Sequence, residues 1–393
     1  MSDRSAAELF PAPETERSTG LWPAQMLRGA VMLGHEIMAA APIADDQIQP
    51  ASIDLRLGEV AYRVRASFLP GAGASVQDKL HSLSMHRIDL AAGAVLEKDC
   101  VYIIPLLEHL ALKKRVSAMA NPKSSIGRLD VFARIITDHG SEFDRIREGY
   151  RGPLYAEISP RAFSILVRTG SRLVQLRIRR GTPLFRDTAL RRLHAEVPLV
   201  EAPGGAAAGI VARGTIRNGL AFTVDLPADL PAHGAPPVGF KARRHTDLID
   251  VDKVGHYDPR EFFEPVYAHA GGLVLDPNDF YILASREAVV VPPDHAAEMI
   301  PYDALVGEFR VHYAGFFDPG FGSAETEGTG SRAVLEVRTH EVPFLVEHGQ
   351  IVGRLIYEPL IARPDRLYGG AIGSSYQRQG LALSKHFKKV AWG

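Results

Sequence analysis

The hydrophobic pattern of this chain is mostly that of short strands. In residues 21–41 the apolar positions recur at helical spacing, which predicts one helix near the start. In residues 48–58 apolar and polar positions alternate, which predicts a half-buried strand. Short apolar runs separated by Gly, Pro and Asp then continue to about residue 180. Many short strands with turn signals favour a β-sandwich or barrel with few, short helices.

This pattern repeats along the chain. The segment GAVLEKDCVYI at residues 93–103 returns as GLVLDPNDFYI at residues 272–282, 179 positions later. The same offset carries Glu157 onto Glu336. A constant offset with the strand patterns in phase predicts two tandem copies of one β-domain. We therefore expect a mainly β protein built from two similar domains.

Segments rich in Pro, Gly and Ala mark the expected connection between the copies. They lie at residues 202–209 and 226–239, and such composition is typical of linkers and turns. We expect a first domain at residues 1–200, a connector at 201–238 and a second domain at 239–393.

Composition narrows the class of protein and its partners. Of the 393 residues, 46% are apolar and 23% are charged, as in a globular protein with a substantial core. The formal net charge of −1 favours neither nucleic acid nor a membrane surface as a partner. The single cysteine, Cys100, rules out an internal disulfide framework. Because no signal-like segment or long apolar run is present, we expect a cytoplasmic protein.

The stretch with the most chemistry is NPKSSIGRLD at residues 121–130. Its proline and glycine predict a tight loop with exposed backbone N–H groups. Lysine, serine and arginine side chains on such a loop can all donate hydrogen bonds to phosphate oxygens, which predicts a polyphosphate site. The residues of this predicted site are Lys123, Ser124, Ser125, Gly127 and Arg128. A basic surface turn is the plainer alternative.

The two copies differ at this loop. The offset of 179 residues places Tyr302, Asp303, Ala304 and Gly307 where the first copy has Lys123, Ser124, Ser125 and Arg128. In contrast, both copies have a glutamate at the equivalent strand position, Glu157 in the first and Glu336 in the second. We therefore expect the first copy to carry the phosphate loop and the second, degenerate copy to be its packing partner.

Four stretches together resemble the dCTP deaminases of the dUTPase-like superfamily. They are IQPASIDLRLG at 48–58, KSSIGR at 123–128, EGYRGPLYAEI at 148–158 and YQRQGLALSKHF at 376–387. The resemblance implies a distorted, jelly-roll-like β-barrel for each of the two copies, and active sites between adjacent barrels. Many members of the family have a single domain, so the doubled chain is a variant of that architecture. It also implies a homo-oligomer with threefold or pseudo-threefold packing of barrels, and hydrolytic deamination of dCTP to dUTP and ammonia. Lys123 is a departure, since the family often has arginine there.

Removing the amino group of cytosine requires an activated water at C4, and protons for the ring nitrogen and the leaving ammonia. A zinc deaminase would carry an H-x-E…P-C-x-x-C signature. His194 and Glu196 match its first part, but one cysteine cannot supply the second. We therefore expect a zinc-free mechanism with a glutamate general base. Glu157, on the alternating strand LYAEIS, is the first choice, and Glu336 is the alternative base.

The resemblance also suggests roles for other side chains. Ser124 is expected to orient the water, and Arg128 to stabilise charge near the glutamate. Substrate contacts are expected from Lys123, Ser125, Gly127, Tyr155, Gln175, Tyr368 and Gln379. Mg²⁺ is expected only as the counterion of the substrate triphosphate. The expected ligands are dCTP and dUTP. Inhibition by dTTP is frequent in the resembled family, and the sequence leaves open whether dTTP inhibits this protein.

Two other functions stay open at this stage. The same barrel hydrolyses the bond at the α-phosphate when an aspartate positions water beside a metal. A dUTPase, or a bifunctional enzyme that converts dCTP to dUMP, is therefore one alternative, with Asp138 and Asp144 as candidate residues. The other alternative is a non-catalytic nucleotide-binding protein, which would bind dCTP or dTTP without turnover.

Overall fold

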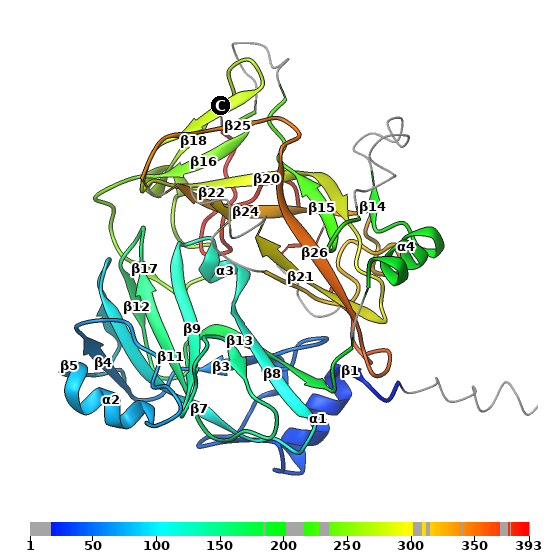
Figure 1. Ribbon diagram of the computed structural model, residues 1–393. Coiled ribbons are helices and arrows are strands. Elements are labelled where there is room, and N and C mark those ends of the chain that lie inside the picture. Colours follow the sequence, from blue (N-terminus) through cyan, green and yellow to red (C-terminus); the bar gives the residue numbers. More distant parts are fainter. Residues whose placement is uncertain are drawn as a thin grey trace, which may run out of the picture.

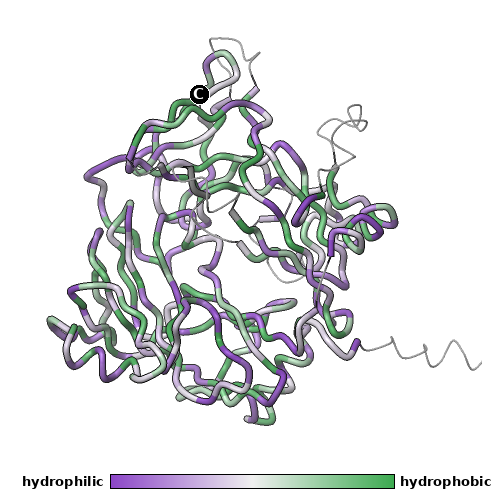
Figure 2. Tube along the Cα trace, in the orientation of Figure 1, coloured by the Kyte–Doolittle hydropathy of each residue, from purple (hydrophilic) through white to green (hydrophobic). Residues whose placement is uncertain are grey.

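The chain forms two β-rich halves that pack against each other (Figure 1). A computed structural model describes residues 17–183, 186–201, 216–227, 236–301, 309–311, 315–339, 341–369, 376–377 and 379–392. Hydrophobic residues are distributed along the strands of both halves (Figure 2). The mainly β fold expected from the sequence is confirmed.

The first half contains two larger sheets. One has the order β1 (Gly20–Leu21), β13 (Arg172–Arg180), β8 (Val116–Pro122) and β10 (Arg145–Ile146), with β3 (Ile53–Arg56) also on β13. The other has the order β5 (Ser84–Asp89), β4 (Val60–Val64), β7 (Val101–Ala111), β11 (Arg151–Pro160) and β9 (Val131–Thr137), with β2 (Ile37–Ala39) on β7. The helices of this half are α1 (Ala24–Met32), α2 (Val76–Leu83) and α3 (Ser124–Gly127), and η2 (Asp45–Gln47) is a 3₁₀ turn.

The second half repeats this plan. One sheet has the order β18 (Phe263–Val266), β16 (Gly239–Ala242), β20 (Phe280–Val289), β24 (Ser331–Thr339) and β22 (Phe309–Val311), with β14 (Val200–Glu201) on β20. The other has the order β15 (Leu220–Thr223), β26 (Ile351–Pro359), β21 (His295–Pro301) and β23 (Phe316–Phe317), and β19 (Gly272–Leu275) pairs with β25 (Phe344–Glu347). Its other elements are α4 (Asp187–Glu196), α6 (Pro259–Phe262) and η3 (Ala324–Thr326).

The internal repeat predicted from the sequence is present in the fold. Strands β21 and β26 have the bounds of β8 and β13 shifted by 179 residues. The strand order β7-β11-β9 returns as β20-β24-β22. Glu157 and Glu336 therefore occupy the same position in two copies of one sheet. The expectation of two tandem domains is confirmed.

Three elements that precede the predicted second domain pack with the second half of the molecule. Leu190 of α4 and Val200 of β14 belong to the hydrophobic core of the second half, so that half begins before residue 201. Strand β15 lies within the predicted connector and pairs with β26. Residues 202–215 and 228–235 of that connector lie outside the described residues.

A small sheet also joins the two halves. Strand β17 (Ile249–Asp250) adds in parallel to β12 (Ile165–Val167), which pairs with β6 (Ala94–Leu96). Near the C-terminus, Phe387 packs in the core of the first half. The halves are thus joined both by strand pairing and by shared core packing.

The helix predicted for residues 21–41 is shorter than expected. It begins after Pro23 and ends at Met32. Gly34 then takes a positive φ of 60°, and residues 37–39 form β2 against β7. The helical prediction is wrong beyond Leu33 because pairing with β7 outweighs the local pattern. Among the described helices, none has the length and apolarity to cross a membrane.

Candidate functional site

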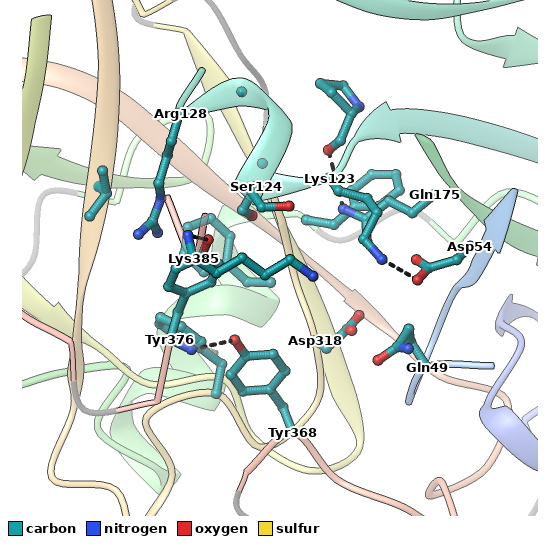
Figure 3. A pocket seen from close by; sticks show the side chains of 18 of the residues that line it. Gln49, Asp54, Lys123, Ser124, Arg128, Gln175, Asp318, Tyr368, Tyr376 and Lys385 are labelled. Carbon is teal, nitrogen blue, oxygen red and sulfur yellow. Dashed lines mark hydrogen bonds and ion pairs between the residues drawn. The ribbon is translucent and has the colours of Figure 1, made fainter. Parts of the chain in front are cut away.

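A cavity of about 360 Å³ lies between the two halves, within the usual size of small-molecule sites. The first half lines it with Asp46, Gln49, Asp54, Pro122, Lys123, Ser124, Ser125, Gly127, Arg128, Arg172 and Gln175. The second half contributes Met299, Gly315, Phe316, Phe317, Asp318, Phe321, Val334 and Glu336, and the C-terminal region adds Tyr368, Tyr376, Gln379 and Lys385. Figure 3 shows side chains from distant parts of the sequence around this space.

The phosphate-loop candidate forms one wall. Strand β8 ends at Pro122, and α3 follows at once. The Lys123 backbone N–H donates to Leu173 O (2.9 Å), which attaches the loop to β13. The Lys123 carbonyl accepts from the N–H groups of Ile126 (2.8 Å) and Gly127 (3.0 Å). This tight turn presents the side chains of Lys123 and Ser124 to the cavity (Figure 3).

Arg128 connects this loop to the C-terminal segment and to the second half. It is 3% exposed, and its Nη2 donates to Gln379 Oε1 (2.9 Å) while Nη1 donates to Ala382 O (3.1 Å). Its guanidinium lies 3.8 Å from the ring centroid of Tyr376. Its Nε lies 3.9 Å from Glu336 Oε1. The arginine is therefore held from several directions, and its charge faces the carboxylate.

Glu336 is the glutamate that the fold brings to this cavity. It lies in β24, paired with Ile282 of β20, and is 4% exposed. Burial raises its pKa to about 7, an effect that the Arg128 charge opposes and nearby Asp130 reinforces. A carboxyl group with this pKa can accept and return a proton near neutral pH.

Glu157, the first-choice base from the sequence, does not line the cavity. It is 1% exposed within the first half and forms an ion pair with Arg134. The Arg134 guanidinium in turn lies 3.8 Å from the Phe143 ring centroid. The physical reason is the packing: the loop of the first half faces β24 of the second half, and β11 faces elsewhere.

Tyr155 shares the strand of Glu157 and also lies away from the cavity. It packs in a separate cluster with Val64, Val76, Leu80, Ile103 and Ile136. Burial raises its pKa to about 12. The other predicted site residues do line the cavity: Lys123, Ser124, Ser125, Gly127, Arg128, Gln175, Tyr368, Gln379 and Glu336.

The loop of the second copy cannot be compared with that of the first. Tyr302, Asp303, Ala304 and Gly307 lie outside the described residues. The predicted loss of chemistry in that loop therefore stays a prediction.

Cations gather at the loop end of the cavity. Lys123 Nζ forms an ion pair with Asp54, a buried residue of β3 (Figure 3). Arg172 makes two hydrogen bonds to the Asp46 carboxylate (3.0 and 3.1 Å). Lys385 reaches the same space, and burial together with the Lys123 charge lowers its pKa. An anionic ligand group placed here would meet three cations from three parts of the chain.

Sequence reasoning missed several of these residues as site residues. Asp54, Tyr376 and Lys385 all lie in stretches that carry the family resemblance. Arg172 and Asp46 carry no comparable local signal. The alternation around Asp54 predicts a half-buried strand, but Ile53, Asp54 and Leu55 are all buried because the polar face of β3 lies against the cavity.

The histidine of the partial zinc-deaminase match and the two aspartates considered for phosphate hydrolysis do not line the cavity. His194 Nδ1 accepts from the Leu199 N–H (3.0 Å). Asp138 accepts from the Val76 N–H and Asp144 from the Ile135 N–H, both at 2.8 Å. In the part of the chain that the structure describes, no group of three or more His, Cys, Asp or Glu side chains could hold a metal ion.

Comparison with known families matches nearly the whole chain. The family described as 2'-deoxycytidine 5'-triphosphate deaminase, N-terminal domain, matches residues 18–182, and its C-terminal domain matches residues 186–387. The chain belongs to the dCTP deaminase family. The resemblance stated from four stretches is confirmed. The two family domains meet between residues 182 and 186, in agreement with the packing of α4 in the second half.

Three relatives of the dCTP deaminase family match different shares of this chain. A crystal structure of 2'-deoxycytidine 5'-triphosphate deaminase from Agrobacterium tumefaciens is 53% identical, with a TM-score of 0.79, and covers 88% of this chain and 100% of that one. A "dCTP deaminase, dUMP-forming" from Kocuria rhizophila is 32% identical over 162 residues, 39% of this chain and 80% of the relative. One from Beutenbergia cavernae with the same description is 30% identical over 136 residues, 34% of this chain and 62% of the relative.

Proposed function

We propose that this chain deaminates dCTP to dUTP and ammonia in the cavity between its halves. The observation that carries the proposal is the placement of Glu336, from the second half, 3.9 Å from Arg128 of the loop in the first half. Ser124 of the same loop lines the same cavity. Membership of the dCTP deaminase family supports the substrate and the reaction.

Glu336 acts as the general base. With a pKa raised to about 7, a substantial fraction of its side chains is ionised at neutral pH. The carboxylate takes a proton from water, and the resulting hydroxide adds to C4 of cytosine. Glu336 passes this proton to ring N3. It then takes the second proton from the new C4 hydroxyl and gives it to the amino group, which leaves as ammonia. The C4 oxygen then forms the carbonyl of uracil, and the carboxylate is regenerated.

Arg128 and Ser124 hold the reacting groups in place. Arg128 keeps its charge beside Glu336, which favours the ionised base and offsets part of the cost of burying it. The Ser124 hydroxyl orients the water, since a hydroxyl can both donate and accept a hydrogen bond. These roles need no zinc, and we propose a zinc-free mechanism.

The cations of the cavity bind the triphosphate. Lys123, Arg172 and Lys385 supply positive charge, and Ser125 adds a polar group to the loop. Mg²⁺ enters as the counterion of the triphosphate. Gln175, Tyr368, Tyr376 and Gln379 contact the rest of the nucleotide. dTTP, which shares the triphosphate and deoxyribose, is expected to compete for the same site.

An ammonia-release assay with dCTP and Mg²⁺ tests the proposal. Glu336→Gln should abolish turnover while it leaves nucleotide binding in place. Glu157→Gln is the matched control. It makes the same substitution at the equivalent position of β11, and Glu157 does not line the cavity. Loss of activity only in Glu157→Gln would contradict the assignment of the base. Binding of dCTP without turnover in the unmodified protein would favour a nucleotide-binding protein instead.

A bifunctional enzyme that forms dUMP is the second candidate. Relatives that match this chain at 30–32% identity are described as dUMP-forming. Asp138 and Asp144 lie outside the cavity, so any water that attacks the α-phosphate would need another carboxylate, such as Asp54 or Asp46. Chromatography of the products separates the two candidates: dUTP indicates deamination alone, whereas dUMP with pyrophosphate indicates both steps.

We further propose that chains associate into a homo-oligomer through their barrels. The resemblance to a family with threefold or pseudo-threefold barrel packing supports this proposal. Light scattering of the purified protein tests it, and a mass of one chain at working concentration would contradict it.

A further inference from the structure

Arg177 is a buried arginine whose side chain donates hydrogen bonds to the opposite half of the molecule. It belongs to β13 of the first half and is 2% exposed. Its Nη1 donates to Ala297 O (2.9 Å), and its Nη2 donates to Phe317 O (2.9 Å) and to Asp318 Oδ1 (3.0 Å). Its guanidinium lies 4.0 Å from the ring centroid of Phe316. One side chain thus fixes a short segment of the second half.

That segment is a wall of the nucleotide cavity. Phe316, Phe317 and Asp318 all line it, whereas Arg177 does not. Figure 3 shows Asp318 in the same space as Gln49 and Tyr368. The repeat places Ile356 of β26 at the position equivalent to Arg177. Of these two equivalent strands, only β13 carries the arginine.

We propose that Arg177 is a positioning residue that holds the Asp318 carboxylate and the Phe316–Phe317 wall in the geometry that binds nucleotide. The proposal rests on the proposed function, in which this cavity takes dCTP. Arg177 acts from behind the wall: it sets the direction of the carboxylate oxygens and the ring of Phe316 without a contact of its own to the ligand.

The electrostatics give the reason why arginine is needed. Asp318 is buried, and burial raises its pKa while the Arg177 charge opposes the rise. Without Arg177 the carboxyl group gains a proton or turns away to find another donor. In either case it no longer offers the same acceptor to the nucleotide. A lysine retains the charge but cannot serve three acceptors in the planar arrangement of a guanidinium.

The test compares dCTP affinity, measured by calorimetry, with kcat/KM for dCTP. Arg177→Gln should weaken dCTP binding at least tenfold, and Arg177→Lys should weaken it less. Asp318→Asn should weaken binding by a similar factor. The double variant Arg177→Gln/Asp318→Asn should bind no worse than the weaker-binding single variant, since both changes remove the same contact.

Arg179 provides the matched control. It lies two residues further along β13 and forms an ion pair with Glu358 across the same interface (3.1 Å), but it does not line the cavity. Arg179→Gln should lower the melting temperature while dCTP affinity stays within about twofold of the wild type. The pH dependence of dCTP affinity is a further readout. As pH is lowered, Arg177→Gln should begin to lose affinity at a higher pH than the wild type, because the Asp318 carboxyl group takes up a proton more readily without Arg177. Two proteins that both carry Asp318→Asn, with and without Arg177→Gln, should not differ in this way.

Three outcomes would overturn the inference. In the first, Arg177→Gln binds dCTP as the wild type does. The second is a sign that the interface has loosened in general, and either of two results would show it. Arg179→Gln weakens dCTP binding as much as Arg177→Gln does, or the loss of affinity in the double variant equals the product of the losses in Arg177→Gln and Asp318→Asn. In the third, the wild type does not bind dCTP. A wild type that binds dCTP without deaminating it contradicts the proposed function alone, because the affinity measurements still decide the role of Arg177.

Discussion

Arg128 Nε and Glu336 Oε1 lie 3.9 Å apart across the boundary between the two halves of the chain. The arginine comes from the loop after β8, and the glutamate comes from a central strand of the second half. Each half therefore contributes one part of a site that neither half contains alone.

The first prediction concerns the pH dependence of catalysis. Burial raises the pKa of Glu336 to about 7, and only the ionised form can act as a base. We expect kcat/KM for dCTP to rise with pH up to about 7 and then to level. Arg128→Gln removes the cation that opposes the rise, so its profile should shift to higher pH and its kcat/KM should fall. A profile in Arg128→Gln that is unchanged in position would contradict this role.

The second prediction concerns stability and the same carboxyl group. Its pKa is higher in the folded chain, at about 7, than the ordinary value of 4.5 for a glutamate side chain, so the folded state binds more protons between these pH values. The contribution of Glu336 to the free energy of unfolding should therefore fall by about 3 kcal/mol as pH rises through this window. Chemical denaturation of wild type and Glu336→Gln should show the wild type losing stability relative to the variant from pH 5 to pH 8. An identical pH dependence of the two proteins would contradict the raised pKa.

The third prediction concerns the phosphate end of the cavity. Lys123→Gln removes a cation from the loop and leaves the buried Asp54 carboxylate without its ion-pair partner. A hydrogen bond to a charged group contributes roughly 1.5–3 kcal/mol, so the Kd of dCTP should rise by about tenfold or more. Calorimetry with deoxycytidine is the control, because a ligand without phosphates should lose little affinity. Equal weakening for both ligands would place Lys123 at the base or sugar instead.

The fourth prediction concerns the C-terminal segment. Gln379 accepts from Arg128 (2.9 Å) and donates to Arg332 O (2.9 Å), so it holds the arginine in place. Gln379→Ala should lower kcat/KM for dCTP by about tenfold, since a buried donor of Arg128 loses its acceptor. Gln377→Ala is the control, because Gln377 donates to Thr326 Oγ1 (2.9 Å) and does not line the cavity. Similar losses in both variants would indicate that the segment acts only as a packed cover.

The fifth prediction concerns the interface between the halves. Arg338 of the second half forms an ion pair with Asp130 of the first half, and both side chains are buried. Arg338→Met should lower the free energy of unfolding by about 3–5 kcal/mol, because it leaves a buried carboxylate without its arginine. Arg338→Met/Asp130→Leu should recover part of this loss. Urea denaturation followed by fluorescence measures both, and a double variant less stable than the single variant would contradict the explanation.

The sequence alone determined the β class, the repeat and the set of chemical groups. Strand alternation and the offset of 179 residues depend on local pattern, and β8, β13, β21 and β26 follow them closely. The loop at residues 121–130 and the pair of equivalent glutamates could also be identified from residue types. Even so, local pattern failed at residues 37–39, where pairing with β7 replaced the expected helix.

Only the tertiary structure decided which glutamate meets the loop. A repeat offset identifies equivalent positions, but it does not say which positions of one copy the packing brings against the other. Glu336 therefore approaches Arg128, while Glu157 pairs with Arg134 in its own half. The contacts of Arg177 with Asp318 arise in the same way, from burial at an interface that no local pattern encodes.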